Sequence, residues 1–254
     1  MKVNCVWEHN GDDTILYSSN FVGAFTRGKS RSEAIKKMPS EIMSYLKWKG
    51  DLISDILEPE IIQEKASELT ISDADSDVLF DEEKKPLSFV EYESLKALAM
   101  KSANDFLTLY RSIPNKDKSV LPVRTTFYGE IPRTAREMYE HTKNVNAYYF
   151  REIGVQADNN GTIEECRNHG FELLEQKQNF LENKVYLGSY DEEWSLRKVL
   201  RRFIWHDRIH AKAMYRMALK TFGKDAVPNV FSFLDYGNSK INRYGFLVNN
   251  SESE

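Results

Sequence analysis

The sequence predicts an α+β protein in which a small strand-hairpin-helix module at the N-terminus precedes an all-α four-helix bundle. Short runs rich in β-forming residues occupy the beginning of the chain. Segments with helical spacing of apolar residues fill most of the chain after residue 88, and an acidic stretch separates the two parts. The expected domains are an α/β module over 1–72, an acidic linker over 73–87, the bundle over 88–222 and a C-terminal tail over 223–254.

Composition indicates a folded, acidic protein. With 41% hydrophobic and 12% aromatic residues, the chain can bury apolar cores rather than remain disordered. Its net charge of −4 and its pI near 5.9 remove the electrostatic case for binding nucleic acid or an anionic membrane, because both require a basic surface. We therefore expect neither of them as a partner.

The cysteines and the N-terminus favour the cytoplasm. Cys5 and Cys166 lie far apart without metal-type CxxC spacing, which is typical of free thiols in a reducing compartment. The first residues lack the apolar segment of a signal peptide, and no apolar run approaches the roughly 18 residues of a membrane span. The sequence therefore predicts a cytoplasmic protein.

The N-terminal module is expected to begin with a β-hairpin. Residues 3–8 and 14–17 are rich in β-formers, and Asn10-Gly11 between them suits the positive φ angles of a tight turn. A third run covers residues 21–26. Strands at Ile61-Ile62 and at residues 69–71 could complete the sheet.

A helix should follow the third run, over residues 31–48. Residues 30–33 read SRSE, which has the form of a capping box. Pro39 stands in the middle of the segment, and we expect it to kink the helix or to split it in two.

The segment VGAFTRGKSRSEAIKKMPSEI resembles the HicB-like module, in which a strand ending in Gly-x-Phe leads through a glycine to a Ser/Thr-capped helix. The matching residues are Gly23, Phe25, Gly28, Ser30, Glu33 and Ala34. The resemblance covers residues 1–50 and implies a hairpin-plus-helix fold related to a reduced ribonuclease-H-like core. In antitoxins this module pairs with a toxin and precedes a DNA-binding segment, but the chain shows no basic helix-turn-helix. We interpret it as a docking or dimerising module, which is compatible with a homodimer.

Four long helices are predicted after residue 87. Residues 88–91 (SFVE) form a capping box for a first helix that ends near residue 112, before Pro114. The long loop that follows, residues 116–132, could cover a site. Pro132 is placed in the first turn of a second helix that ends near Gly154.

The third and fourth helices carry similar start signals. Residues 162–165 (TIEE) and 189–192 (SYDE) have the capping form. The fourth helix is expected over residues 192–222, and an aromatic-rich tail should then pack on the bundle or on the first module.

The fourth helix carries a pair of histidines on its apolar stripe. His206 and His210 are four residues apart, so both imidazoles can point at the same place. His141 occupies the corresponding stripe of the second helix, in register with Met138 and Val145. If these helices are neighbours, three imidazoles converge inside the bundle. Three neutral nitrogen ligands leave a divalent metal with an open position, which marks a catalytic rather than a structural site.

Two other metal motifs share part of this pattern. His206-Asp207-x-x-His210 differs by one residue from the zincin H-E-x-x-H, but aspartate is one methylene shorter and no further ligand stands at a zincin spacing. The adjacent His206-Asp207 also matches HD phosphohydrolases, which need more ligands than the five histidines here allow. We expect Asp207 instead to face a neighbouring helix and to pair with an arginine there.

The remaining candidates receive structural interpretations. Tyr148 lies two turns beyond His141 and is expected to pack in the core, although it could donate to a bound ligand. Arg202 lies one turn before His206 and could hold an anionic group, but solvation at the surface is the favoured interpretation. His9 and His169 are expected to be exposed.

One histidine on the second helix and H-x-x-x-H on the fourth resemble the DinB/YfiT-like metal-binding bundle family. The segment LRRFIWHDRIHAKAMYRM is similar to that family's pattern, and the resemblance covers residues 88–222. It implies that His141, His206 and His210 bind a divalent ion, with zinc or nickel the first choices. Several members of the family are thiol-dependent transferases acting through mycothiol or bacillithiol.

Two functions follow as hypotheses. The first is a metal-dependent enzyme, a thiol transferase or hydrolase, that acts on a small thiol or another small molecule at an open coordination position. The second is a metal-stabilised interaction or regulatory protein whose HicB-like module binds a partner. Imidazole ligands suit several divalent ions, so the residues alone do not select the metal.

Overall fold

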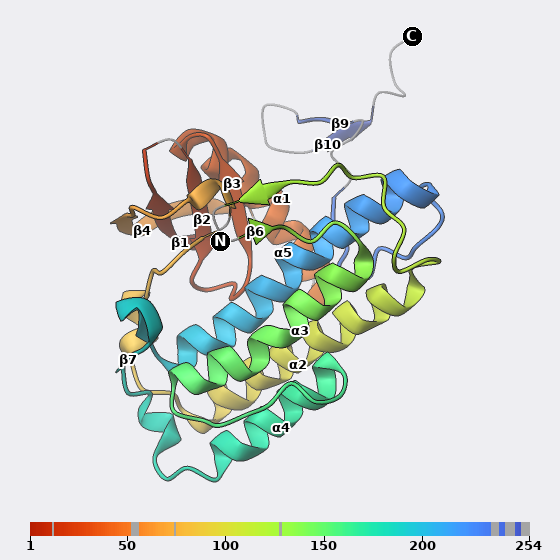
Figure 1. Cartoon of the computed structure of the whole chain (residues 1–254). Coiled ribbons are helices and arrows are strands. Elements are labelled where there is room, and N and C mark those ends of the chain that lie inside the picture. The colour runs from red at the N-terminus through yellow and green to blue at the C-terminus, as the bar shows by residue number, and fades with distance from the viewer. Residues whose placement is uncertain are drawn as a thin grey trace. The chain divides into compact units, whose positions relative to one another are not determined.

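The computed structural model describes residues 1–11, 13–51, 56–73, 75–126, 129–234, 239–241 and 247–249. The chain divides into two compact units (Figure 1). The first unit comprises residues 1–76 and 231–254, and the second comprises residues 77–230.

The first unit is built on a four-stranded sheet with the order β3-β2-β1-β4. Its elements are β1 (Lys2–His9), β2 (Thr14–Ser18), β3 (Phe25–Gly28), helix α1 (Arg31–Lys49), β4 (Glu58–Ala66) and the 3-10 helix η1 (Ile71–Asp73). Strands β1, β2 and β3 pair antiparallel, whereas β4 pairs parallel with β1. A parallel neighbour needs a long crossover connection, and α1 lies in that connection.

The expected strands are confirmed only in part. The hairpin forms as predicted, and Ile61-Ile62 lies in β4. The third strand begins only at Phe25, and the strand expected over residues 69–71 is absent because Ile71 opens η1. Strands β9 (Ser239–Ile241) and β10 (Leu247–Asn249) form a separate antiparallel pair in the same unit.

Helix α1 begins and ends at the signals present in the sequence. The Ser30 side chain accepts a hydrogen bond from the Glu33 backbone, and Gly50 ends the helix with a left-handed φ of 92°. The helix continues through Pro39, so the expected split does not occur. Proline keeps a helical φ, and the buried side chains of Met38 and Ile42 hold the helix on either side of it.

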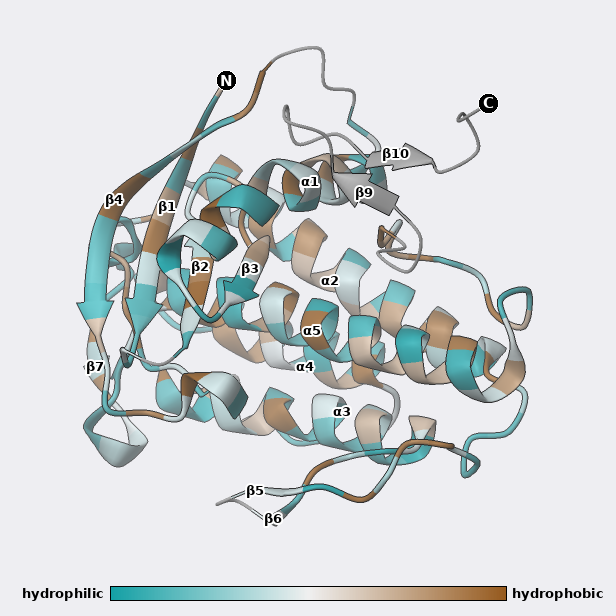
Figure 2. Cartoon of the chain, turned by 90° about the horizontal axis from the view of Figure 1, so that it is seen from above, coloured by the Kyte–Doolittle hydropathy of each residue, from teal (hydrophilic) through white to brown (hydrophobic). Residues whose placement is uncertain are grey.

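Four helices pack around one core in the second unit. They are α2 (Phe89–Ser112), α3 (Ala135–Glu152), α4 (Ile163–Glu175) and α5 (Leu196–Phe222). Both α2 and α3 contact α4 and α5, and Figure 1 shows the four helices side by side. Teal and brown segments alternate along α5 in Figure 2, as expected for a helix with one polar and one apolar face.

The predicted fold class is nevertheless wrong in its second part, because this unit is not an all-α four-helix bundle. The described chain contains five α-helices, and the second unit also contains two short antiparallel ladders. These are β5 (Thr125–Thr126) with β6 (Gly129–Glu130), and β7 (Tyr186–Leu187) with β8 (Glu193–Trp194). Helix α4 has only 13 residues. The segments outside the long helices satisfy part of their backbone hydrogen bonding in these ladders and in three 3-10 helices. These are η2 (Asp81–Lys84), η3 (Phe180–Glu182) and η4 (Ser189–Asp191).

Of the four predicted helix starts in this unit, those of α2 and α4 are confirmed, whereas α3 and α5 begin later than predicted. Capping boxes open α2 at Ser88, α3 at Thr134 and α4 at Thr162. The fourth long helix starts at Leu196, behind the cap Ser195, and not at residue 192. The preceding SYDE segment instead forms η4 and a turn. Pro132 lies before the α3 cap rather than in the first helical turn.

A cluster of aromatic rings fills the core between α3, α4 and α5. Phe150, Phe171 and Phe203 are completely buried, and their ring centroids lie 5.2–6.1 Å apart. Gly170 faces the ring of Phe150, and any Cβ at this position would overlap that ring. The absence of a side chain at Gly170 therefore allows α4 to approach α3 closely.

The acidic segment before α2 contributes to the second unit. Phe80 and Glu83 are buried, and the Glu83 carboxylate pairs with the guanidinium of Arg201 on α5. In the first unit, the start of the tail packs as expected on the N-terminal module, where Phe231 stacks on Trp48 with ring centroids 5.3 Å apart. In the described part of the chain, every helix is too short or too polar to cross a membrane.

Candidate metal centre

Three histidines from two neighbouring helices converge in the second unit. His141 comes from α3, and His206 and His210 come from successive turns of α5. One nitrogen from each ring lies within 4.8 Å of the other two. Tetrahedral imidazole ligands at 2.0–2.1 Å from an ion would stand about 3.3 Å apart. Small side-chain rotations would close this difference, so the group could hold a metal ion.

The rings contact one another directly. The centroid distances are 4.4 Å between His206 and His210, 4.6 Å between His141 and His210, and 5.2 Å between His141 and His206. The i, i+4 spacing sets the first distance, whereas the other two depend on the packing of α3 against α5.

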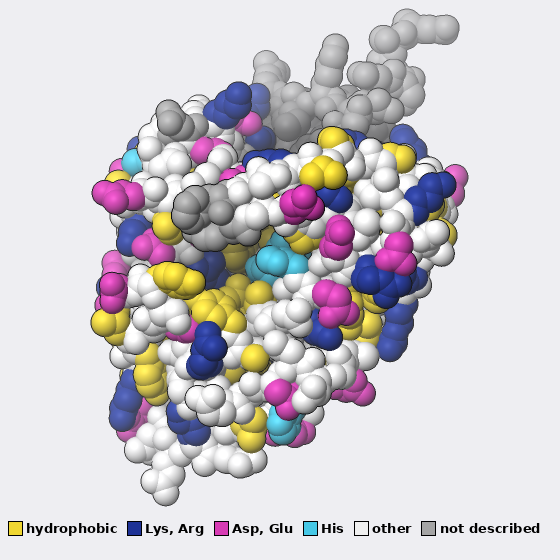
Figure 3. Space-filling model, viewed as in Figure 1, with side chains coloured by type: hydrophobic (Ala, Val, Ile, Leu, Met, Phe, Trp, Pro, Cys, Tyr) yellow, Lys and Arg dark blue, Asp and Glu magenta, His cyan; other side chains and the backbone are white. Residues whose placement is uncertain are grey.

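The group reaches from the interior to the surface, and the expectation that His141 points inward is wrong. His206 is 7% exposed and His210 is half-buried, but His141 is exposed. Histidine side chains come to the molecular surface over α3 and α5 (Figure 3). Thr142 and Asn146 of α3 are fully buried instead. One side of the group can therefore be reached by solvent or a small molecule.

Their surroundings keep the imidazoles neutral. Burial lowers the pKa of all three rings. For His210, burial and the neighbouring His141 lower the pKa to about 3. For His206, burial comes first, and its proximity to His210, His141 and Arg202 adds to the fall in pKa. Neutral rings keep a nitrogen lone pair free, which is the form that binds metals.

The chemistry of the donors fits a bound cation. Among the described residues, Nδ1 of His206 is buried and has no hydrogen-bond partner. Buried polar atoms are nearly always satisfied, so an orphaned nitrogen in a group of neutral imidazoles needs an explanation. An ion held by this group, or water ordered around it, would supply the missing interaction.

Asp207 points away from the histidines. Its carboxylate accepts hydrogen bonds from the guanidinium of Arg167 on α4 and from the hydroxyl of Ser102 on α2. Burial raises the pKa of Asp207, and Arg167 and Ser102 oppose that rise. The predicted pairing with an arginine of a neighbouring helix is thus confirmed. The zincin alternative fails, because this carboxylate is engaged elsewhere.

Arg202 is placed differently from the expectation of a solvated side chain. It is 6% exposed, and its Nη2 lies 2.8 Å from Oε1 of Glu192. Tyr148 is partly buried, with its ring centroid 5.8 Å from that of Trp194. His169 is exposed as expected, whereas His9 in the first unit is half-buried and bonds Glu64 at 3.1 Å.

Sequence reasoning missed two residues beside the histidines. The ring of Tyr149 lies edge-on to His206, with centroids 6.0 Å apart, and burial raises its pKa to about 12. Glu192 was assigned to the first turn of the fourth helix, which concealed its contact with Arg202. In the sequence, the available signal for Tyr149 was that it directly follows Tyr148. In the structure, its ring packs against Phe203 and His206 of α5.

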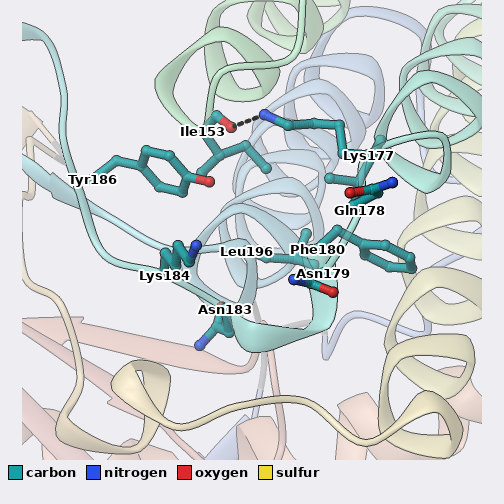
Figure 4. Close-up of a pocket in the computed structure, with 10 residues that line it drawn as sticks. Ile153, Lys177, Gln178, Asn179, Phe180, Asn183, Lys184, Tyr186 and Leu196 are labelled. Atoms are coloured by element: carbon teal, nitrogen blue, oxygen red, sulfur yellow. Dashed lines mark hydrogen bonds between the residues drawn. The ribbon is translucent and has the colours of Figure 1, made fainter.

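A separate pocket of about 50 Å³ lies near the C-terminal ends of α3 and α4 (Figure 4). At its edge, Nζ of Lys177 donates to the backbone oxygens of Ile153 and Gly154, at 3.2 and 2.8 Å. The lining residues are Ile153, Leu174, Lys177, Gln178, Asn179, Phe180, Asn183, Lys184, Tyr186 and Leu196. None of the three histidines is among them, and the volume suits only about one or two water molecules.

Comparison with protein-family models, curated proteins and solved structures found no match to this chain. The resemblances to the DinB/YfiT-like and HicB-like families stay predictions from the motifs. The functional argument therefore depends on the geometry of the histidines.

Proposed function

We propose that the protein is a metal-dependent enzyme in which His141, His206 and His210 hold one divalent ion, zinc or nickel. The observation that supports this proposal is the convergence of three neutral imidazole nitrogens within 4.8 Å of one another, at a place that solvent can reach. When bound, such an ion lowers the pKa of a coordinated thiol or water and makes it a nucleophile near neutral pH. The reaction class is thiol transfer or hydrolysis.

The surrounding residues favour a nucleophile that needs no separate base. Asp207 is held by Arg167 and Ser102 and is not available to accept a proton. Among the described residues, the three histidines form the single group of metal-ligand type, with no carboxylate in it. A thiol already ionises near pH 8.5, so it requires less help than water. Thiol transfer is therefore the first reaction to test.

The metal assignment is tested by elemental analysis and calorimetric titration of the full chain purified without an affinity tag. We expect one zinc or nickel ion per chain, and His206→Ala should weaken binding by more than about a hundredfold. His169→Ala is the matched control, because His169 is an exposed histidine of the same unit outside the group. Tight metal binding retained in His206→Ala would contradict the proposal.

The reaction is tested on protein loaded with cobalt. Titration with a small thiol should give a sulfur-to-metal absorption band, because an open position admits the thiolate. A screen for thiol transfer to electrophilic substrates follows. Stoichiometric metal without binding of any thiol or inhibitory anion would exclude the enzyme and favour a metal-stabilised interaction protein.

One observation supports that second function. Strand β4 is an edge strand of the sheet in the first unit, and its residues alternate between exposed and half-buried. A strand at a sheet edge offers backbone groups to a strand from a partner. The HicB-like resemblance implies such a partner.

A further inference from the structure

The histidine pair continues a longer row of side chains on α5. Lys198, Arg202, His206 and His210 follow one another at intervals of four residues. Neighbours at this spacing lie one above the other on a helix. Two cations therefore stand directly before the two imidazoles.

Both cations meet at one carboxylate oxygen. Oε1 of Glu192 lies 2.8 Å from Nη2 of Arg202 and 2.8 Å from Nζ of Lys198. Nζ of Lys198 also donates to the backbone oxygens of Asp77 and Glu193, so Lys198 is anchored by other contacts. Arg202 and Lys198 are both buried, and buried cations require a negative partner. Both cations share Glu192 as a negative partner.

Glu192 lies in a strained surface turn. Tyr190 and Asp191 immediately before it both adopt left-handed backbone conformations, with φ of 61° and 59°. Such angles are unfavourable for a tyrosine, and its side chain is 93% exposed, so burial of the ring does not compensate. The strands on either side, β7 and β8, have two residues each. Within the turn, the backbone oxygen of Glu192 accepts a hydrogen bond from Gly188 N–H, and the N–H of Glu192 donates to the oxygen of Ser189.

Aromatic side chains connect this turn to the histidines. The guanidinium of Arg202 lies 5.5 Å from the ring centroid of Trp194, and the rings of Trp194 and Tyr149 are 5.4 Å apart. Tyr149 in turn contacts His206. Among the described residues, the buried indole N–H of Trp194 has no hydrogen-bond partner. Between the turn that carries Glu192 and the histidines, the indole N–H of Trp194 is therefore a hydrogen-bond donor that a bound anion could use.

We propose that Arg202 is the anion-binding residue of the histidine site, with Lys198 adding charge, and that Glu192 holds the place of a substrate carboxylate. This rests on the proposed function, because it names the substrate class of the same site. A carboxylate that replaces Glu192 conserves the ion pairs with Arg202 and Lys198. An anion that binds Arg202 and Lys198 in place of Glu192 keeps their shared contact, so the turn opens when such an anion is available. A substrate held there would lie one helical turn from His206.

The test uses the full chain, with acetate as the probe and sodium chloride of equal ionic strength as the reference. Acetate binding is measured by calorimetry on cobalt-loaded protein and by thermal shift on metal-free protein. Glu192→Gln should raise acetate affinity by about tenfold or more, because the internal competitor has lost its charge. The double variant Glu192→Gln/Arg202→Gln should lose that gain.

Glu83→Gln is the matched control, since it removes the carboxylate from another buried arginine of α5, Arg201. It should not raise acetate affinity. If Glu192→Gln does not fold, Glu192→Asp retains the charge with a shorter reach and should show a smaller gain.

The two proposals fail in different ways. Cobalt binding without any gain in acetate affinity in the Glu192 variants overturns the anion site and leaves the metal assignment intact. Equal gains in Glu192→Gln and Glu83→Gln overturn it too. Absence of cobalt binding in the unaltered protein overturns the metal assignment, whereas the thermal shift of metal-free protein still decides the anion site.

Discussion

Arg167 and Asp207 form a two-bond ion pair in which both side chains are completely buried. Nη2 of Arg167 lies 3.0 Å from Oδ1 of Asp207, and Nη1 bonds Oδ2. The hydroxyl of Ser102 donates to the same carboxylate. Because Asp207 follows His206 directly, this contact fixes the rotation of α5 and turns His206 toward α3.

Removal of this carboxylate should destabilise the protein strongly. Asp207→Ala leaves the Arg167 guanidinium buried without a counter-charge, and we expect the free energy of unfolding to fall by about 3–5 kcal/mol. Urea denaturation followed by circular dichroism measures it. Asp117→Ala breaks the exposed pair with Arg136 and should change stability little. Similar losses in both variants would contradict this interpretation.

Metal-free protein should lose stability as the pH falls from 7.5 to 5.5. The pKa of His206 and of His210 is lowered in the folded state and returns to about 6.5 on unfolding. The unfolded state then binds more protons below pH 6.5, so the free energy of unfolding falls with pH, by up to about 1.4 kcal/mol per unit for each histidine. Denaturation in a chelator at several pH values tests this. His206→Gln should show a shallower dependence, and a stability that is constant or rises on acidification would refute the prediction.

Zinc should raise the thermal midpoint through all three histidines together. An ion that binds only the folded chain adds about 2.7 kcal/mol at a concentration one hundred times its dissociation constant. His141→Ala should remove most of this shift although His141 is exposed, because it supplies the single donor from α3. Differential scanning calorimetry with and without zinc gives the result. A full shift in His141→Ala would restrict the ligands to α5.

Gly170→Ala should destabilise the helical unit although alanine favours helices. The added Cβ overlaps the ring of Phe150, and overpacking of this kind costs about 1–3 kcal/mol. Asn168→Ala on the exposed side of α4 serves as the control in urea denaturation. Phe150→Leu combined with Gly170→Ala should recover part of the loss, since it removes the edge of the ring. A stabilising Gly170→Ala would show that α4 does not approach α3 so closely.

The local features of this protein were readable from its residues. Ser88 and Thr162 lie three residues before the glutamates that complete their capping boxes, so these two helix starts are encoded in one turn. Thr134 and Glu137 have the same spacing, but the prediction placed Pro132 in the first turn of that helix. Ser189 and Glu192 also have this spacing, but Glu192 bonds Arg202 and Lys198 instead of closing a cap.

What the sequence alone determined was the adjacency of His206 and His210, because helix geometry places residues four apart on one face. It also indicated that His141 belonged to them and that Asp207 would find an arginine. Tertiary structure decided that the arginine is Arg167, that His141 is exposed, and that Glu192 forms an ion pair with Arg202. These contacts join segments far apart in the chain, and their geometry depends on how helices of unequal length pack. No pattern within a single helix carries that information.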